Sequence, residues 1–376
     1  MKNKKLITLL YYIFRVFPIK KNKIVFCNYV GKGYGCNPKY IAEELIKRDL
    51  DLDLVWMLKE DVAVFPNQIR TVEWESLRAI YELATAKVWV DNQRKLPYNK
   101  KRKGQYFIAT WHGGTPLKKI GADNPLNKND LPYEQTSLHM DKIVDVMVAS
   151  CSWCADIYRT AFLYSGEIME CGYPRNDILV KDTSLYYKKV REYFGLEPDV
   201  KLVMYAPTYR KGRRTDIYQL DYKMLCDSLE KRFLGKWKVL VRLHPTMANK
   251  SGELQYSENV INASGYADMQ ELMAGVDVLV SDYSTIVGEF PLSGKPVFLF
   301  AVDKADYAIE RDFYYEYDKM PFPQAGTNAG LADVIEAFDE EKYQVDLEKY
   351  YENIGRKDFG NASAAVADRI EEVMRN

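Results

Sequence analysis

The chain has 376 residues, 47% of them hydrophobic and 28% charged, which is typical of a folded protein with two domains. Lys and Arg together number 53, as do Asp and Glu, and this neutral balance argues against a dedicated nucleic-acid-binding protein. The six cysteines follow no disulfide pattern, which fits a reducing compartment. The single Cys151-x-x-Cys154 pair has neither a zinc-site nor a thioredoxin-like context.

The N-terminal segment, residues 1–22, is basic and apolar, and the first acidic residue of the chain is Glu43. The apolar run 6–19 (LITLLYYIFRVFPI) is shorter than the roughly 20 residues that span a bilayer, and no small-residue cleavage site follows it. Two interpretations are open: a helix lying in an anionic membrane interface, or an N-terminal helix docked on the first domain. The lack of acidic residues favours the membrane. A basic stretch at 94–103 either extends that face, attracts a phosphorylated substrate, or is a solvated hairpin.

Short apolar runs alternate with amphipathic stretches along the rest of the chain. This alternation predicts parallel sheets covered by helices on both faces. The predicted strands are 23–29, 52–58, 87–91, 106–110, 145–150, 201–206, 238–243, 277–281 and 296–300. The predicted helices between them are 38–48, 75–86, 152–164, 221–233 and 267–275.

The strands fall into two sets, with a polar, helix-prone segment at 181–199 between them. We therefore expect a membrane-associating segment (1–22), a first Rossmann-like domain (23–183) and a second one (184–376). A last helix near 363–374 could cross back to the first domain. Two such domains that face a central cleft would bind ligands beyond the carboxyl ends of their strands.

The loop 110–121 (TWHGGTPLKKIG) follows a predicted strand and holds His112, one of only three histidines. Gly113 and Gly114 remove side chains beside it, so that a substrate could approach closely. An imidazole pKa near 6.5 suits a general base. Lys118 and Lys119 either steer anions or are solvated.

Two later strand ends suggest a phosphate site. In RLHP (242–245), the Arg242 guanidinium suits a diphosphate, and His244 could donate to a phosphate oxygen or protonate a leaving group; a structural histidine is the alternative. In SDYST (281–285), a helix starting near Ser284 would offer free N–H groups and the hydroxyls of Ser284 and Thr285. An ordinary helix cap at Asp282 or Ser284 explains the segment equally well.

Two other features look structural. His139 has no catalytic neighbourhood, and the Asp-x-Asp in DLDL (51–54) stands at the start of a strand rather than at its end, where a metal-binding motif would be expected.

As an ordered set, five strand-end segments resemble the CDP-glycerol glycerophosphotransferase family, whose members build teichoic acids. The segments are WHGGTPLK (111–118), GYPRND (172–177), YAPTYR (205–210), RLHP (242–245) and SDYS (281–284), and the stretch 31–45 looks like the family's opening. This chain departs from the family pattern in three places. Gly114 is an extra glycine, Thr285 replaces a second serine, and Gly288-Glu289-Phe290 stands where Phe-Asp often follows.

The resemblance implies a glycosyltransferase-B-type α/β fold, peripheral attachment to the cytoplasmic face of a bacterial membrane, and CDP-glycerol as donor. It implies that His112 and His244 are catalytic. With it, we expect substrate contacts from Gly113, Gly114, Arg175, Asp177, Thr208, Arg210, Arg242, Ser284 and Thr285. The expected acceptor is a lipid-linked glycan or a glycerol-phosphate polymer. No metal site or obligatory cofactor is expected, with Mg²⁺ left open, and no nucleic-acid partner.

Three alternatives stay open. The donor could be CDP-ribitol, or a nucleotide sugar contacted by Glu271 or Glu289 in a glycosyltransferase of the same fold. The chain could also be a non-catalytic membrane-bound lectin or scaffold, although the paired His112 and His244 argue against that.

Overall fold

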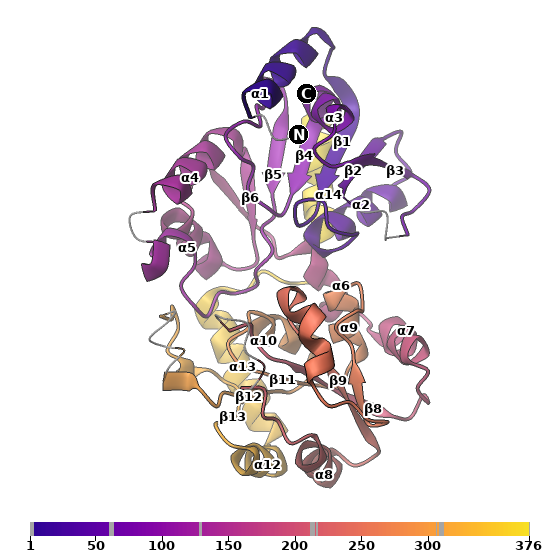
Figure 1. Ribbon diagram of the computed structural model, residues 1–376, viewed down its shortest axis with the longest axis vertical. Helices are drawn as coiled ribbons and strands as arrows, with labels where there is room; N and C mark the ends of the chain where they lie inside the picture. The colour runs from indigo at the N-terminus through magenta and orange to yellow at the C-terminus, as the bar shows by residue number, and fades with distance from the viewer. Residues whose placement is uncertain are drawn as a thin grey trace. The chain divides into compact units, whose positions relative to one another are not determined.

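The computed structural model describes residues 4–59, 64–127, 130–210, 215, 217–305, 307 and 312–375. In this part of the chain the strands form two parallel sheets, one in each of two compact units (Figure 1). Unit 1 comprises Met1–Gly113, Ile120–Asp177 and Lys357–Asn376, and unit 2 comprises Gly114–Lys119 and Ile178–Arg356.

The sheet of unit 1 has the strand order β3-β2-β1-β4-β5-β6-β7, and neighbouring strands are parallel. In β1 the apolar run from Ile24 to Cys27 is buried, as expected of a parallel strand covered on both faces. The strands are β1 (Lys20–Cys27), β2 (Asp53–Leu58), β3 (Ile69–Glu73), β4 (Ala86–Asp91), β5 (Tyr106–Ala109), β6 (Val146–Ala149) and β7 (Glu167–Glu170).

Helices connect these strands, and several begin at a side-chain cap. Ser76 and Asp130 each accept a hydrogen bond from a backbone N–H of the helix that follows them, which fixes where those helices start. The helices of unit 1 are α1 (Lys4–Ile13), η1 (Phe14–Val16), α2 (Cys36–Lys47), α3 (Leu77–Thr85), η2 (Gly121–Asp123), η3 (Pro125–Asn127), α4 (Leu131–Ile143), α5 (Ser152–Ala161), η4 (Pro174–Asn176) and α14 (Ala362–Arg375).

The sheet of unit 2 has the order β10-β9-β8-β11-β12-β13, again parallel. Its strands are β8 (Lys201–Ala206), β9 (Trp237–Val241), β10 (Val260–Asn262), β11 (Val278–Ser281), β12 (Val297–Phe300) and β13 (Gln324–Ala325). Its helices are α7 (Ser184–Phe194), α8 (Tyr222–Phe233), η5 (Pro245–Glu253), α9 (Met269–Gly275), α10 (Ile286–Glu289), η6 (Phe290–Ser293), η7 (Tyr317–Lys319), α12 (Asn328–Glu336) and α13 (Glu340–Ile354), while α6 (Asp177–Val180) contains the junction with unit 1.

The nine strands and five connecting helices expected from the sequence are confirmed within a few residues at their ends. The sequence prediction missed β3, β7, β10 and β13, because short strands at or near a sheet edge carry little apolar signal. In β7, for example, two glutamates flank Ile168 and Met169, and no residue is fully buried. The helix expected near Ser284 begins two residues later, at Ile286, and α10 has only four residues.

The C-terminal helix α14 belongs to unit 1, although all of unit 2 precedes it in the chain. Val366, Ala367 and Ile370 are fully buried in the same hydrophobic cluster as Ile24 of β1 and Ile41 of α2. Figure 1 accordingly draws α14 in yellow among the indigo elements of unit 1.

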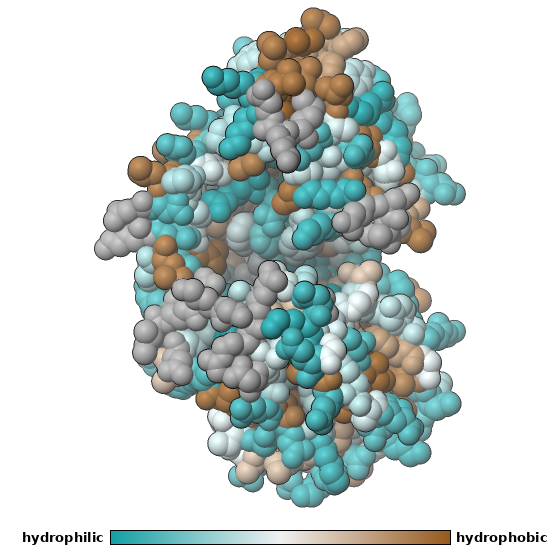
Figure 2. All heavy atoms as spheres, in the orientation of Figure 1, coloured by the Kyte–Doolittle hydropathy of each residue, from teal (hydrophilic) through white to brown (hydrophobic). Residues whose placement is uncertain are grey.

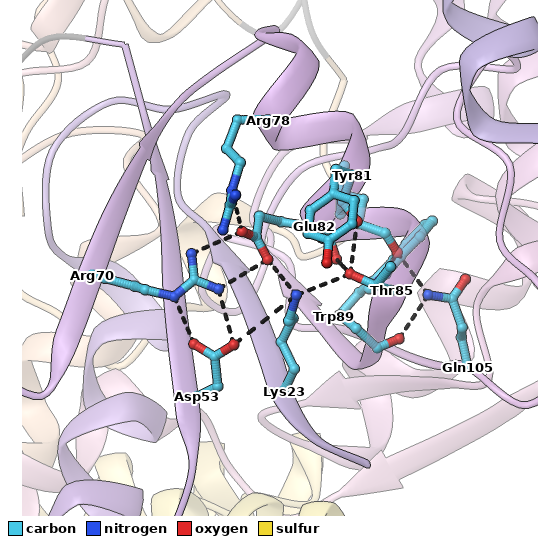
Figure 3. A network of polar contacts seen from close by, with 11 residues as sticks. Lys23, Asp53, Arg70, Arg78, Tyr81, Glu82, Thr85, Trp89 and Gln105 are labelled. Carbon is cyan, nitrogen blue, oxygen red and sulfur yellow. Dashed lines mark hydrogen bonds and ion pairs between the residues drawn. The ribbon is translucent and has the colours of Figure 1, made fainter. Parts of the chain in front are cut away.

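A buried ion network lies near the amino ends of β1 and β2 (Figure 3). The fully buried Lys23 ammonium lies 2.5 Å from Glu82 and 2.9 Å from the Thr85 hydroxyl, and Arg70 donates two hydrogen bonds to Asp53. Burial by itself would raise the pKa of Glu82, but hydrogen bonds from Arg70 and Lys23 lower it to about 2. Asp53 of the DLDL segment therefore has a structural ion-pair partner.

Candidate active site

The strand order of each sheet indicates where a ligand would bind. The order reverses between β1 and β4 in unit 1, and between β8 and β11 in unit 2. In doubly wound sheets, ligands bind beyond the carboxyl ends of the strands at such a reversal. The segments that follow these four strands are therefore the candidate binding regions of the two units.

His112 follows β5, the strand next to β4, and its ring is half-buried. Its Nδ1 lies 2.7 Å from the carbonyl oxygen of Asn92, the residue after β4. A carbonyl oxygen can only accept, so Nδ1 carries the proton of the neutral ring and Nε2 holds a lone pair. The rings of Tyr29 and Trp111 pack on the imidazole, with centroids 5.3 and 4.0 Å away.

The surroundings of His112 keep it uncharged at neutral pH. Burial lowers the pKa of His112 to about 4, because the Asn92 hydrogen bond offsets only part of the lost solvation and Arg175 and Arg94 add repulsion. A neutral imidazole with an unprotonated Nε2 is the form that a general base requires.

His244 follows β9 of unit 2, and its side chain is exposed. Its Nδ1 accepts a hydrogen bond of 3.2 Å from the backbone N–H of Thr246 and lies 2.8 Å from the hydroxyl of the same residue. Since a backbone N–H can only donate, Nε2 carries the proton of the neutral ring. Protein atoms around the ring reduce its solvation, and this, together with the charge of Lys118, lowers the pKa of His244.

Gly113 and Gly114 have close protein neighbours. A Cβ at Gly114 would lie 2.0 Å from Oε1 of Glu289, and one at Gly113 would lie 3.0 Å from Nε1 of Trp111. Glu289 is buried and accepts a hydrogen bond from Gln270, so it has little freedom to move away. The extra glycine of this chain thus has a packing reason, besides the substrate access that the sequence suggested.

Arg175 and Asp177 are buried and hold other parts of unit 1. Nη1 of Arg175 donates to the carbonyl oxygen of His112 at 2.7 Å and to Sγ of Cys36 at 3.2 Å. The Asp177 carboxylate accepts hydrogen bonds from the backbone N–H groups of Ala362 and Ser363, at 3.0 and 2.8 Å. Asp177 therefore caps the first turn of α14.

Arg210 is buried, and its hydrogen bonds join two loops of unit 2. Its guanidinium binds Asp282 at 2.9 Å, Asp303 at 2.7 and 2.9 Å, and the carbonyl oxygen of Thr208 at 2.6 Å. Asp282 also accepts from the backbone N–H of Thr208, so it ties the segment after β11 to the segment after β8 rather than capping a helix. With its donors occupied in this way, Arg210 orients the strand-end loops.

Hydroxyl groups at the strand ends of unit 2 are better placed to meet a ligand. Thr208 is only 8% exposed, and its hydroxyl has no hydrogen-bond partner among the described residues. Ser284 and Thr285 are half-buried beyond β11. Arg242 donates to the carbonyl oxygens of Ala263 and Tyr266 at 2.9 and 2.7 Å, which joins the ends of β9 and β10.

The predicted anion-steering lysines have partners as well. Lys119 forms an ion pair of 2.6 Å with Asp312, and Lys118 donates to the hydroxyl of Tyr307 at 3.1 Å. Sequence reasoning missed Asn92, Asn28 and Asn37, which surround the His112 loop. The only available signal was an asparagine directly after a strand, as in VDN (90–92) and CN (27–28), and many turns share that pattern.

Two Rossmann-like units, each with polar groups gathered beyond a reversal of a parallel sheet, define a protein of the glycosyltransferase-B-type α/β class. Residues 9–372 match the family model described as CDP-Glycerol:Poly(glycerophosphate) glycerophosphotransferase. The match covers nearly the whole chain, so the protein belongs to this family.

Among curated proteins, the chain is 31% identical to the teichoic acid poly(glycerol phosphate) polymerase of Staphylococcus epidermidis, over 95% of this chain but 51% of that protein. It thus spans about half the length of that relative. It is 28% identical to the polymerase of the same name from Bacillus spizizenii, over 98% of both chains.

Among solved structures, the wall teichoic acid polymerase TagF is similar with a TM-score of 0.85 and 28% identity, over 99% of this chain and 95% of that one. A TagF variant described as soaked with CDPG gives 0.87 and 29%, over 100% and 94%. A putative UDP-N-acetylglucosamine 2-epimerase from Listeria monocytogenes, at 14% identity and a TM-score of 0.54 over 94% and 96%, shares the fold alone.

Proposed function

We propose that the protein transfers glycerol phosphate from CDP-glycerol to a hydroxyl group of a membrane-associated acceptor, in the synthesis of teichoic acid or a related cell-surface polymer. The acceptor oxygen forms a bond to the phosphorus that carries glycerol. The bond between that phosphorus and the bridging oxygen breaks, and CMP leaves. The proton of the acceptor hydroxyl passes to Nε2 of His112, while Nε2–H of His244 donates to the phosphate of the departing CMP.

The observation that carries this proposal is that the two histidines are held in opposite tautomers. Nδ1 of His112 donates to a carbonyl, which leaves Nε2 as an acceptor. Nδ1 of His244 accepts from a backbone N–H, which leaves Nε2 as a donor. One histidine is thus suited to remove a proton, and the other to stabilise a leaving phosphate through a hydrogen bond.

The donor site proposed in unit 2 is supported by the groups that lie beyond β8, β9 and β11. The buried hydroxyl of Thr208 lacks a partner among the described residues, so a phosphate oxygen there would satisfy it. Ser284 and Thr285 add hydroxyl groups beyond β11, and Arg242 adds a cation beyond β9. A related structure soaked with CDPG supports the choice of donor.

Histidine replacements test this assignment. With CDP-glycerol and a synthetic lipid-linked acceptor, His112→Gln should lower CMP release by about 10²- to 10⁴-fold, the usual contribution of a general base. Binding of CDP-glycerol, measured by calorimetry, should stay within about threefold. His139→Gln is the matched control, because His139 lies on α4, outside either candidate region. Full turnover by His112→Gln would remove the base from the mechanism.

Neutral His244 has only its Nε2–H to offer, so its proposed role is to donate a hydrogen bond to the leaving phosphate. His244→Gln keeps a side-chain N–H donor and should slow the release of CMP less than His244→Ala does. Equal losses in the two variants would exclude the hydrogen bond from Nε2–H.

CDP-ribitol is a second candidate donor, because the chain is also 29% identical, over 98% of its length, to a teichoic acid poly(ribitol-phosphate) polymerase of Bacillus spizizenii. A competition assay with equal CDP-glycerol and CDP-ribitol, read by mass spectrometry of the product, separates the two. We propose CDP-glycerol because the family model and the polymerases of Staphylococcus epidermidis and Bacillus spizizenii described above are named for glycerol phosphate.

We also propose that the protein acts as a peripheral enzyme at the cytoplasmic face of the membrane, where α1 contacts anionic lipid. Ile7 and Tyr11 of α1 pack into unit 1, but most of its other apolar side chains are exposed, and Figure 2 shows a hydrophobic patch over this helix. Lys4 and Lys5 are exposed at its start. The exposed set is Leu6, Leu9, Tyr12, Ile13, Val16 and Phe17. In the described residues, no helix has both the length and the hydropathy to cross a bilayer.

Vesicle sedimentation tests the membrane proposal. We expect binding to vesicles that contain phosphatidylglycerol and weaker binding to phosphatidylcholine alone. A triple replacement by glutamine of Leu6, Leu9 and Val16 should abolish binding, whereas the same change at three exposed leucines elsewhere (Leu131, Leu185 and Leu234) should not. Equal loss in both triple variants would show that α1 has no special role.

A further inference from the structure

The carbonyl group that fixes the tautomer of His112 belongs to Asn92, and the side chain of the same residue is held in place. Asn92 is 1% exposed. Its Oδ1 accepts from the backbone N–H of Tyr29 at 2.8 Å, and its Nδ2 donates to Oδ1 of Asn28 at 2.7 Å. These two hydrogen bonds tie the Asn92 amide to the loop after β1.

Asn28 continues this chain of amides. It is 4% exposed, and its Nδ2 donates to the carbonyl oxygen of Lys32 at 2.8 Å. Asn28 and Asn92 directly follow β1 and β4, which pair in parallel with Cys27 opposite Asp91. The two side chains therefore bridge the reversal point of the sheet, where a ligand is expected.

The backbone around this bridge is strained. Tyr29, Val30 and Trp111 all have positive φ values, of 42°, 62° and 53°, in a region that residues with a side chain rarely adopt. Such strain persists only where surrounding contacts over-determine the conformation, and it concentrates at functional sites. Here Tyr29 and Trp111 are the two residues whose rings pack on His112.

A second asparagine clamp holds the other side of the loop. Nδ2 of Asn37 donates to the carbonyl oxygens of Thr110 and Trp111, at 3.1 and 3.2 Å. The main chain on both sides of the imidazole is thus fixed by buried amide side chains. The peptide group that contains the Asn92 carbonyl is also held by the Gln93 N–H, which donates to Oδ1 of Asp91 at 2.8 Å. The Asn92 side chain adds a restraint from the loop after β1.

We propose that Asn92, supported by Asn28, is a positioning residue for catalysis: its side chain fixes the direction of its own carbonyl group, which holds His112 in the Nδ1–H tautomer and aims Nε2 at the acceptor hydroxyl. This inference rests on the proposed role of His112 as the base. It goes further by naming the groups that prepare that base.

The alternative is that the Asn28–Asn92 bridge stabilises the loops without affecting the imidazole. The two interpretations differ in what a replacement changes. A bridge that only stabilises would lower the unfolding temperature and leave the surviving folded enzyme normal. A bridge that positions His112 would leave CDP-glycerol binding intact, lower kcat and redistribute the proton between Nδ1 and Nε2.

The experiment uses the full-length protein with Asn92→Ala, Asn28→Ala and the control Asn124→Ala. Asn124 is also a buried asparagine of unit 1, 5% exposed. Its side chain accepts from the backbone N–H of Leu126 at 3.0 Å, and its own backbone N–H donates to Gly121, at the far end of the loop from His112. Two-bond ¹H–¹⁵N spectra of histidine-labelled protein distinguish the tautomers, and the three histidine signals are assigned with His139→Gln and His112→Gln.

In the wild-type protein and in Asn124→Ala, we expect His112 to be neutral with its proton on Nδ1. In Asn92→Ala the Nε2–H form should appear, and kcat should fall about 10- to 100-fold, as is usual when the partner that orients a functional histidine is lost. The KM for CDP-glycerol should stay within about twofold. Asn28→Ala, which leaves the Asn92 side chain in place, should show the same changes at smaller size and provides the test if Asn92→Ala does not fold.

An unchanged Nδ1–H tautomer in both folded variants, or an unchanged kcat, would overturn the proposal. The spectra need no substrate, so failure of the proposed function is separately visible. In that case the wild-type protein would release no CMP from CDP-glycerol, while the tautomer measurement would still report on Asn92.

Discussion

At the scale of single residues, the chemistry proposed for this protein depends on where the imidazole protons lie. His112 and His244 have similar positions beyond strand ends, yet the first faces a carbonyl oxygen and the second a backbone N–H. These partners, rather than the residue type, decide which histidine can act as a base. Both rings also have lowered pKa values, so both are neutral at pH 7.

The pKa of His112 predicts an unusual pH profile. A histidine of ordinary pKa, about 6.5, would lose activity as a base below that pH. His112, with a pKa of about 4, stays unprotonated as the pH falls from 7 to about 5. We therefore expect kcat/KM to be nearly constant over this range. An acidic limb centred near pH 6.5 in the wild-type enzyme would contradict the predicted shift.

The unpartnered hydroxyl of Thr208 leads to a second prediction at this scale. Thr208→Val keeps the shape of the side chain and removes only the hydroxyl, which makes no hydrogen bond within the described residues. If the hydroxyl binds a donor phosphate, the KM for CDP-glycerol should rise about 10-fold or more, since hydrogen bonds to charged groups contribute about 1.5–3 kcal/mol. The unfolding temperature should not fall. A stable variant with an unchanged KM would exclude the contact.

At the scale of secondary-structure elements, capping and sheet order place the functional segments. The short helix α10 offers little as an anion site, because backbone N–H groups of its first turn bond to carbonyl groups of Ser284 and Thr285, at 3.3 and 3.2 Å. The hydroxyls of Ser284 and Thr285 and the Asp282–Arg210 ion pair are the polar groups that line this end of the sheet. Arg210 follows β8 and Asp282 follows β11, and the two residues meet because these strands are neighbours where the strand order reverses.

A replacement of Asp177 distinguishes a residue that contacts substrate from one that caps a helix. Because its carboxylate receives two backbone N–H groups at the start of α14, Asp177→Ala should destabilise the protein by about 0.5–2 kcal/mol. The KM for CDP-glycerol should not change. Urea unfolding and steady-state kinetics measure the two effects, and a large rise in KM with normal stability would restore the assignment as a substrate residue.

At the scale of the whole molecule, the chain leaves unit 1 twice and ends in it. The C-terminal segment supplies core residues of α14, and Asp358 accepts from the backbone N–H of Tyr173 at 2.7 Å. Unit 1, with its proposed base, is therefore complete only when the last residues of the chain are present.

Deletion of residues 357–376 should expose the cluster around Ile24 and Ile41 and unfold unit 1 selectively. Hydrogen exchange followed by mass spectrometry should show fast exchange in β1 and β4, while β8 and β11 stay protected. Intact protection of β1 in the shortened chain would contradict the role given to α14. A shorter deletion that removes only residues 375–376, beyond the buried positions, is the control.

The sequence by itself determined the fold class and the main candidate residues, since apolar strands, amphipathic helices and a histidine among glycines are local patterns. The tertiary structure decided what those residues do. Arg210 joins two loops by binding Asp303, which is 93 positions away in the sequence. Asp177 caps a helix that begins 185 positions away. The tautomer of His112 depends on a backbone carbonyl group. Because every residue has one, the sequence does not indicate which carbonyl will contact the imidazole. Folding alone brings that carbonyl to the imidazole.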